Sequence, residues 1–284
     1  MDTSLSDTAA PAGLVATIMA GQDAAKSPAA QREQNCDKHG PYVSLQRWPG
    51  GSFWSACPAC EQQRAERLKA EEEAERAREA EQKAEHARSR RLELSGLEGR
   101  MLRSTFENFQ ATTDAHRKVL QACKALVSPL VTGDGGGLWL LGSPGTGKTH
   151  LGSAMVSHVI NVERKRACIH SARELVRMLR SSWSKRGQPS EFAQWYPETE
   201  DEIVEYVGMA GLFVLDEIGS SFNSDAERTQ LFDIIDLRYK HSLPTVLISN
   251  LDADGIRAAL GERSFDRLRE GARVLSCAWP SHRR

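Results

Sequence analysis

The sequence has 284 residues, of which 40% are apolar and 26% are charged, with a formal net charge of -1. This length suffices for one enzyme-sized domain and a smaller appendage. The balanced charge excludes a protein that binds nucleic acid through a global positive field, so such a contact would need a local basic patch. No stretch approaches the roughly 20 apolar residues that cross a bilayer, and the N-terminus lacks the features of a signal peptide. We therefore predict a cytoplasmic protein with no membrane contact.

The first 60 residues are too short and too polar to form a core of their own. Residues 1–34 are rich in Ala, Ser, Asp and Gln, which predicts a disordered tail. Residues 35–60 place Gly and Pro between short aromatic runs, which predicts a small hairpin-rich module. The basic residues there are only Lys38 and Arg47, so we expect this surface to contact a protein rather than phosphates. The aromatic residues beside them are Tyr42, Trp48, Phe53 and Trp54.

This module carries four residues of the kinds that bind zinc, as Cys36-x2-His39 and Cys57-x2-Cys60. Each pair forms a tight knuckle, and three thiolates with one imidazole fill a tetrahedral site that keeps no open position for water. We therefore predict a structural zinc ion whose binding energy replaces the missing core. The alternative is four incidental residues. The other cysteines are predicted to be small buried side chains: Cys123, Cys168 and Cys277.

Residues 61–96 are dominated by Glu, Gln, Arg, Lys and Ala, with no Gly or Pro before Gly96. Strong helix formers at this density, with opposite charges three or four residues apart, predict a long helix. Its only Leu before the end is Leu68, so the apolar stripe of a coiled coil is missing. We interpret this segment as a solvated spacer, with a partner-binding helix as the alternative.

Residues 97–284 alternate short apolar runs with amphipathic stretches, which predicts a parallel sheet covered by helices. Helices are expected over residues 150–164 and 226–240. The expected strands are 138–141, 167–170, 212–215, 245–249 and 273–278.

Residues 142–149, GSPGTGKT, match the pattern G-x-x-x-x-G-K-[ST] between a predicted strand and a predicted helix. In such a loop, backbone N–H groups and the helix N-terminus surround a polyphosphate. Lys148 is predicted to reach the β- and γ-phosphates, and the Thr149 hydroxyl to bind Mg²⁺. A chance glycine turn is the alternative. The predicted nucleotide contacts are Gly142, Pro144, Gly145, Thr146, Gly147, Lys148, Thr149 and His150.

Two further strands end in polar residues that suit phosphate chemistry. The run GLFVLDEIG at 211–219 ends its strand at Asp216, which can join Thr149 in holding Mg²⁺, and at Glu217, which can orient or deprotonate water. An acidic cap on the next helix is the alternative. Asn250 follows the strand TVLIS and is predicted to bond the γ-phosphate or that water, although it could equally be a turn residue.

Residues 171–187 predict an amphipathic helix with one basic face. Arg173, Arg177 and Arg180 share that face, Lys185 and Arg186 follow it, and the apolar residues lie opposite. A basic, partly aromatic track of this kind can bind single-stranded DNA. An ordinary solvated polar face is the alternative. The apolar residues are Leu175, Leu179 and Trp183.

The order of phosphate loop, Asp-Glu strand and Asn-tipped strand resembles that of AAA+ ATPases. Within that class, four stretches resemble the DnaC-type helicase loaders and their IstB relatives, over about residues 97–284. The zinc pattern is similar to the N-terminal module of phage-type members. The four stretches are RSTFENF at 103–109, VLDEIG at 214–219, GERSFDRLREG at 261–271 and WPSHR at 279–283.

The resemblance implies a three-layer α/β P-loop AAA+ fold without a C-terminal lid, preceded by the zinc hairpin and the charged helix. It also implies that Arg267 is an arginine finger acting on the γ-phosphate of a neighbouring subunit. Arg283 matches a second nucleotide-sensing arginine. A site completed by a neighbour implies self-association into an ATP-dependent ring or spiral.

The function implied is an ATP-dependent loader that places a DnaB-like replicative helicase on single-stranded DNA during replication initiation. The N-terminal region would hold the helicase, and ATP hydrolysis would switch the assembly. One alternative is an IstB-like transposition helper that binds duplex DNA. Another is an ATP-dependent adaptor that does not hydrolyse ATP, which the intact Lys148, Asp216 and Glu217 argue against.

Overall fold

The computed structural model describes residues 30–46, 51–133, 136–183, 197–218 and 225–282. The chain divides into two compact units, residues 1–81 and residues 82–284, which are described separately below. Among the described residues, no helix is both long and apolar enough to cross a bilayer.

The N-terminal unit contains a two-stranded hairpin. Strand β1 (Gln31–Cys36) pairs antiparallel with β2 (Gly40–Leu45), in a register that runs from Gln31 opposite Leu45 to Cys36 opposite Gly40. β1 begins inside the segment predicted as a tail, because its backbone is paired with β2. A bridge between Gln46 and Trp54 continues the pairing beyond β2. The predicted hairpin is thus confirmed.

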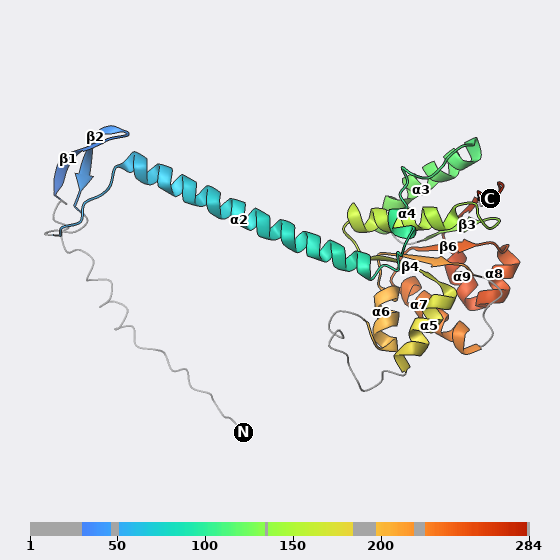
Figure 1. The fold of residues 1–284 in the computed structure, drawn as a ribbon. Helices are drawn as coiled ribbons and strands as arrows, with labels where there is room; N and C mark the ends of the chain where they lie inside the picture. Colours follow the sequence, from blue (N-terminus) through green and yellow to red (C-terminus); the bar gives the residue numbers. More distant parts are fainter. Residues whose placement is uncertain (1–29, 47–50, 134–135, 184–196, 219–224, 283–284) are drawn as a thin grey trace, which may run out of the picture. The chain divides into compact units, whose positions relative to one another are not determined.

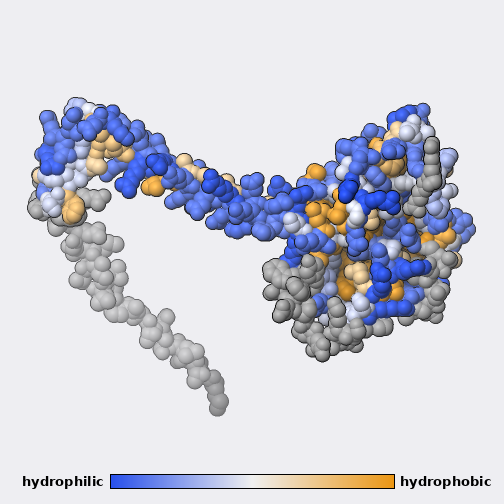
Figure 2. Space-filling model, in the orientation of Figure 1, coloured by the Kyte–Doolittle hydropathy of each residue, from blue (hydrophilic) through white to orange (hydrophobic). Residues whose placement is uncertain are grey.

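Helix α2 (Pro58–Glu93) confirms the predicted charged helix. It begins with a proline, which suits the first helical position because the N–H that proline lacks has no partner there. No residue of this helix, all of which the structure describes, is buried. Ion pairs one turn apart, such as Arg67 Nε to Glu71 Oε1 at 2.8 Å, support it. Figure 2 shows it as a mainly hydrophilic rod.

The second unit is built on a five-stranded parallel sheet in the order β4-β5-β6-β3-β7. All five predicted strands are confirmed, with ends shifted by at most two residues. The strands are β3 (Gly137–Leu141), β4 (Ala167–Ser171), β5 (Leu212–Asp216), β6 (Thr245–Ser249) and β7 (Ala272–Ser276).

Helices cover both faces of this sheet and complete three layers (Figure 1). On one face α3 (Asp114–Thr132) and α4 (Lys148–Asn161) enclose the first apolar core, which also takes in Leu97 and Trp279. The other face carries the second core. Its helices are α5 (Ala172–Trp183), α6 (Glu200–Gly208), α7 (Asp225–Lys240), α8 (Ala253–Leu260) and α9 (Glu262–Arg269).

A fully buried arginine joins α7 to the end of α6 and to the start of β6. Arg238 of α7 is 1% exposed and donates hydrogen bonds to Thr245 Oγ1 and to the backbone oxygens of four residues. Burial lowers the pKa of its guanidinium to about 10. Its charge is therefore compensated by carbonyl dipoles rather than by a carboxylate. The four carbonyl residues are Val207, Gly208, Ala210 and Pro244.

Candidate nucleotide site and zinc centre

The phosphate loop connects β3 to α4, as predicted, and its shape depends on glycine. Gly147 immediately precedes α4 with φ +84°, and a Cβ there would lie 2.8 Å from Phe109 Cε2. A Cβ on Gly142 would lie 2.4 Å from the carbonyl oxygen of Cys277. Neither position has room for a side chain. The close packing of Phe109 and Cys277 against the loop therefore requires glycine at both positions.

Lys148 lies within this loop and is 7% exposed. Its Nζ donates to the carbonyl oxygens of Gly142 and Ser143, both at 2.8 Å. The ammonium group is therefore held at the concave side of the loop, among the groups predicted to bind phosphate.

Thr149 and Asp216, predicted to share a magnesium ion, are in direct contact. Thr149 Oγ1 donates to Asp216 Oδ2 at 2.8 Å, which joins the first turn of α4 to the end of β5. Burial raises the pKa of the Asp216 carboxyl, while the hydrogen bonds from Thr149 and from the Glu217 N–H act in the opposite direction. A buried carboxylate beside a hydroxyl is a donor set that suits a hard cation such as Mg²⁺.

Glu217 follows β5 with φ +50°, in the left-handed region that residues other than glycine seldom adopt. Its backbone N–H donates to Asp216 Oδ1 at 2.7 Å, and its side chain is exposed. This conformation turns Glu217 away from the buried strand and towards the cavity that it lines. Strain of this kind is typical of functional sites.

A cavity of about 760 Å³ brings most of the predicted site residues together, but Gly142 and Arg267 are not among the residues that line it. The phosphate loop from Pro144 to Thr149 lines it, along with His150, Asp216, Glu217 and Asn250. Asn250 is exposed and directly follows β6, as predicted. Sequence reasoning missed one part of the wall, which comes from the segment before α3 and lies far from the phosphate loop in sequence. Those residues are Arg100, Met101 and Ser104.

His150 fixes that segment to α4. Its Nε2–H donates to the carbonyl oxygen of Thr105 at 2.9 Å, and its ring lies edge-on to Phe109 with centroids 5.5 Å apart. The stretch 103–109, which carries part of the family resemblance, is therefore held against the first turn of α4.

The predicted amphipathic helix is α5, and its apolar face is buried as expected, with Leu175 and Leu179 both 0% exposed. The basic face points into the nucleotide cavity, whose lining includes Arg173, Arg177 and Arg180. Arg180 Nη2 forms an ion pair with Glu227 Oε1 at 2.8 Å. The basic face and the phosphate loop thus share one cavity, which the sequence pattern did not indicate. Lys185 and Arg186 lie outside the described residues.

Of the two arginines predicted to contact nucleotide, the structure describes only Arg267. Arg267 lies on α9, outside the lining of this cavity, and its Nη2 pairs with Asp236 Oδ1 at 2.7 Å. Its guanidinium also lies over the ring of Phe232, 4.4 Å from the centroid. Arg283 lies outside the described residues.

The side of the phosphate loop away from the cavity is covered by the segment after β7. Trp279 Nε1 donates to the carbonyl oxygen of Thr146 at 3.1 Å, and the His282 backbone N–H donates to that of Gly145 at 2.9 Å. The ring of His116 lies 4.5 Å from that of Trp279, in a T-shaped arrangement. These contacts join residues at least 133 positions apart, so no local pattern could predict them.

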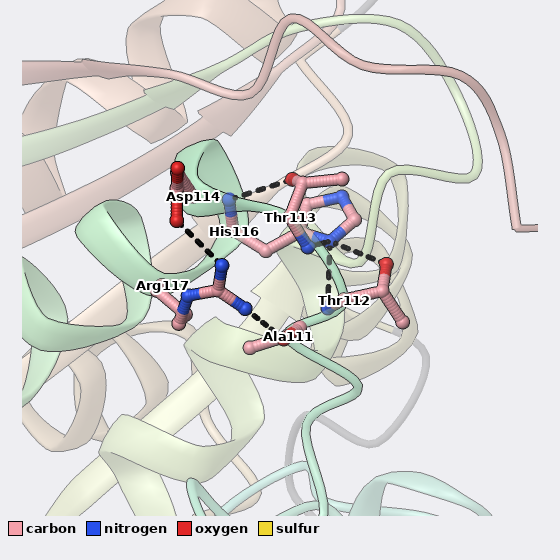
Figure 3. A network of polar contacts seen from close by, with 6 residues as sticks. All are labelled: Ala111, Thr112, Thr113, Asp114, His116 and Arg117. Atoms are coloured by element: carbon pink, nitrogen blue, oxygen red, sulfur yellow. Dashed lines mark hydrogen bonds and ion pairs between the residues drawn. The ribbon is translucent and has the colours of Figure 1, made fainter.

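Figure 3 shows how His116 is held at the start of α3. Its Nδ1 accepts hydrogen bonds from the N–H groups of Thr112 and Thr113, and Thr113 caps the helix in return. Nδ1 is thus an acceptor, so the proton of the neutral ring is on Nε2. Burial, with the charges of His282 and Arg117, lowers the pKa of His116 and favours this neutral form.

The four predicted zinc ligands come together in the N-terminal unit. Their ligand atoms all lie within 4.8 Å of one another. Cys60 Sγ is 3.3 Å from His39 Nδ1 and 3.5 Å from Cys36 Sγ, and Cys57 Sγ is 3.7 Å from His39 Nδ1. Tetrahedral zinc with ordinary bond lengths requires about 3.5–3.8 Å between such atoms. The residues therefore fit a four-coordinate zinc ion.

The protonation tendencies of the thiols agree with a cation at their centre. The backbone N–H groups of Lys38 and His39 stabilise the Cys36 thiolate and lower its pKa to about 6. The neighbouring Cys36 sulfur raises the pKa of Cys60 to about 11. A cation bound between these sulfurs would favour their thiolate forms, because a metal-bound thiol is deprotonated. The remaining cysteines are buried as predicted: Cys123, Cys168 and Cys277.

Comparison with known proteins agrees with this geometry. The sequence matches the family described as IstB-like ATP binding protein over residues 55–283. It is 30% identical over 190 residues to the replicative helicase loader DnaC of Buchnera aphidicola subsp. Schizaphis graminum, covering 66% of this chain and 73% of the relative.

The solved structures that resemble this fold include those of the DnaC helicase loader and of DnaI. The DnaC helicase loader superposes with a TM-score of 0.53 and 22% identity, over 63% of this chain and 99% of its own. DnaI superposes with a TM-score of 0.53 and 23% identity, over 68% of this chain and 100% of its own. At such identities the likeness concerns the fold alone, and it confirms the predicted fold class.

Proposed function

Because this chain belongs to the IstB-like family of ATP-binding proteins and is an AAA+ ATPase of the DnaC type, we propose that it loads a DnaB-like replicative helicase onto single-stranded DNA in an ATP-dependent manner. The ATP-dependent part is carried by one observation, the 2.8 Å contact between Thr149 Oγ1 and Asp216 Oδ2. It joins the phosphate loop to the acidic strand end, as a site for Mg²⁺ and nucleotide requires.

In this proposal the loop residues 142–149 bind the phosphates through backbone N–H groups, and Lys148 adds a positive charge. Thr149 and Asp216 hold Mg²⁺, which neutralises phosphate charge when it is bound. Glu217 orients the attacking water and accepts its proton. Asn250 donates a hydrogen bond to that water or to the γ-phosphate. His150 supports the wall of the site from the first turn of α4.

Arg267 acts on the γ-phosphate of a neighbouring subunit. Support for this role comes from its position outside the cavity of its own chain and from the ion pair with Asp236, which fixes its direction. Because a neighbouring subunit completes the site, ATP binding favours self-association into a ring or spiral. Hydrolysis of ATP then reverses this association. Arg283 is proposed as a second sensor on the strength of the motif alone.

The helicase is held by the zinc module. Val43 and Leu45 share one face of β2 and are 49% and 45% exposed, and Phe53 nearby is 63% exposed. Such exposure in a small module favours a protein interface. The zinc ion is structural, bound by Cys36, His39, Cys57 and Cys60, and α2 is the spacer.

Single-stranded DNA is bound along the basic face of α5. Arg173, Arg177 and Arg180 supply charges along one face, at a spacing that can follow a phosphate backbone. These arginines line the same cavity as the phosphate loop, so a nucleotide bound in the cavity would change the electrostatic environment of their guanidinium groups. This arrangement offers a physical link between ATP and DNA binding.

The test is complex formation with a DnaB-like replicative helicase, measured by size-exclusion light scattering with ATP, with ADP and without nucleotide. We expect a complex whose mass depends on nucleotide, and whose dependence is lost in Lys148→Ala. Val43→Asp should abolish the complex. Its control is Val274→Asp on β7, an equally exposed valine of the other unit at 58%.

Absence of a complex in every nucleotide state would overturn the loader proposal. The rival is the IstB-like transposition helper, which shares the ATPase unit, and it predicts ATP-dependent filaments on duplex DNA instead. The cysteine-histidine module and the similarity to DnaC favour the loader.

A further inference from the structure

The side of the phosphate loop away from the cavity is held by two hydrogen bonds from the segment after β7. Trp279 is 8% exposed, and its indole N–H has the Thr146 carbonyl as acceptor at 3.1 Å. The His282 backbone N–H has the Gly145 carbonyl at 2.9 Å. Gly145 and Thr146 line the cavity, whereas Trp279 and His282 do not. The loop therefore lies between the cavity and this segment.

These contacts fix the orientation of two peptide planes. In a trans peptide, the carbonyl of one residue and the N–H of the next point in opposite directions, and the described residues contain no cis peptide. When the Gly145 and Thr146 carbonyls point to His282 and Trp279, the N–H groups of Thr146 and Gly147 point to the other side. That side is the cavity, where an anion would be bound by such N–H groups.

We infer that Trp279 is a positioning residue for nucleotide binding, because it holds the loop so that the Thr146 and Gly147 N–H groups face the phosphates. The His282 backbone N–H acts in the same way one residue earlier. This inference rests on the proposal that the loop binds nucleotide. It adds a residue that contacts no ligand and acts only through the Thr146 carbonyl.

Trp279 is suited to this task because its ring is buried and packed against another ring. The His116 ring packs against it at 4.5 Å, and His116 is itself fixed by the two N–H groups at the start of α3. Phe109 packs against the loop at Gly147. A rigid donor loses little entropy on forming its bond, so the loop geometry is prepared before nucleotide arrives.

The first experiment compares two buried tryptophans that each donate to a backbone carbonyl. Trp279→Phe keeps an aromatic ring but removes the N–H to Thr146. Trp139→Phe is the matched control, since the Trp139 N–H donates to the Leu268 carbonyl at 3.2 Å and Trp139 is 3% exposed. We expect both to lower the melting temperature, and only Trp279→Phe to weaken ADP and ATP binding, by about fivefold, the value of one hydrogen bond.

The second experiment leaves the core untouched. His282 is exposed, and His282→Ala removes its ring but keeps its backbone N–H. His282→Pro removes both the ring and the N–H, so the two variants differ chiefly in that N–H. We expect His282→Pro to bind ADP and ATP several-fold more weakly than His282→Ala. This pair decides the question if Trp279→Phe does not fold.

Binding is measured by titration of a fluorescent ADP analogue and by competition with ATP. Wild-type affinity in Trp279→Phe and in His282→Pro would overturn the inference while leaving the nucleotide site intact. An equal loss in Trp139→Phe would also overturn it, because general destabilisation would then explain the effect. Absence of binding by the wild-type chain would instead refute the proposed nucleotide site.

Discussion

The two units of this chain differ in the size of their apolar cores. In the ATPase unit, two apolar cores of fully buried side chains lie on either face of a parallel sheet. In the zinc module, only Ser44 and Cys57 are buried among residues 30–46 and 51–57. A core of that size cannot offset the entropy of ordering the chain. We therefore expect the proposed zinc ion to order the module, whereas apolar packing orders the ATPase unit.

Metal removal should produce the largest difference in stability between the two units. We expect a strong chelator to release about one zinc per chain and to unfold β1 and β2, because zinc contributes about 10–16 kcal/mol in small zinc modules. Hydrogen exchange should rise over residues 31–45 and stay unchanged over residues 137–141. Cys60→Ser should behave like the chelated protein, and Cys123→Ala should keep its zinc. A purified protein that has no metal and an ordered hairpin would refute the comparison.

The reverse experiment weakens the ATPase unit alone. Arg238→Met should lower its free energy of unfolding by about 3–5 kcal/mol, since buried acceptors would lose their donor. Urea denaturation followed by fluorescence measures this loss, and the zinc content should not change. Arg76→Met on the exposed face of α2 is the control and should cost under about 0.5 kcal/mol. An equal effect of both substitutions would contradict the role of burial.

Within the ATPase unit, one substitution should reduce ATP hydrolysis without changing folding stability. Glu217→Gln keeps the size of the side chain but cannot accept a proton, so ATP turnover should fall by about 100-fold or more. Nucleotide affinity and melting temperature should stay close to those of the wild type. Glu205→Gln, on the exposed side of α6, should leave turnover unchanged. Normal turnover in Glu217→Gln would contradict the catalytic assignment.

The smallest expected effect concerns acid stability of the ATPase unit. The pKa of His116 is lowered from 6.5, chiefly by burial, and burial also lowers the pKa of His170. As the pH falls below 6.5, the unfolded chain takes up protons that the folded chain does not, so stability falls. His116→Gln should preserve the helix cap, since Gln suits this position, and should make the decline of stability with falling pH shallower.

Urea unfolding at pH 7.5 and at pH 5.5 measures this difference, with the metal-stripped protein used so that zinc release does not contribute. An identical pH dependence in His116→Gln and in the wild type would assign the decline to other groups. His170 would then be the next histidine of the ATPase unit to test, because burial lowers its pKa too.

Sequence reasoning succeeded where the determinant is local. The strands follow apolar runs, α2 follows a density of helix formers, and the phosphate loop follows a short motif with glycine at fixed positions. The zinc ligands were found for the same reason, because two residues of each knuckle lie three positions apart. The polar ends of β5 and β6 were also predictable, since parallel strands bring their carboxyl ends to one edge of the sheet.

Sequence patterns were therefore sufficient for the five sheet strands, for α2, α4 and α7, for the phosphate loop, for the Cys/His cluster and for the amphipathic character of α5. Tertiary structure alone decided that the arginines of α5 line the nucleotide cavity, that Arg238 satisfies carbonyls beneath the sheet, and that Trp279 lies behind the loop. The physical reason is distance along the chain. Periodicity reports only which side of an element is apolar, whereas these contacts depend on strand order and packing between segments far apart in sequence.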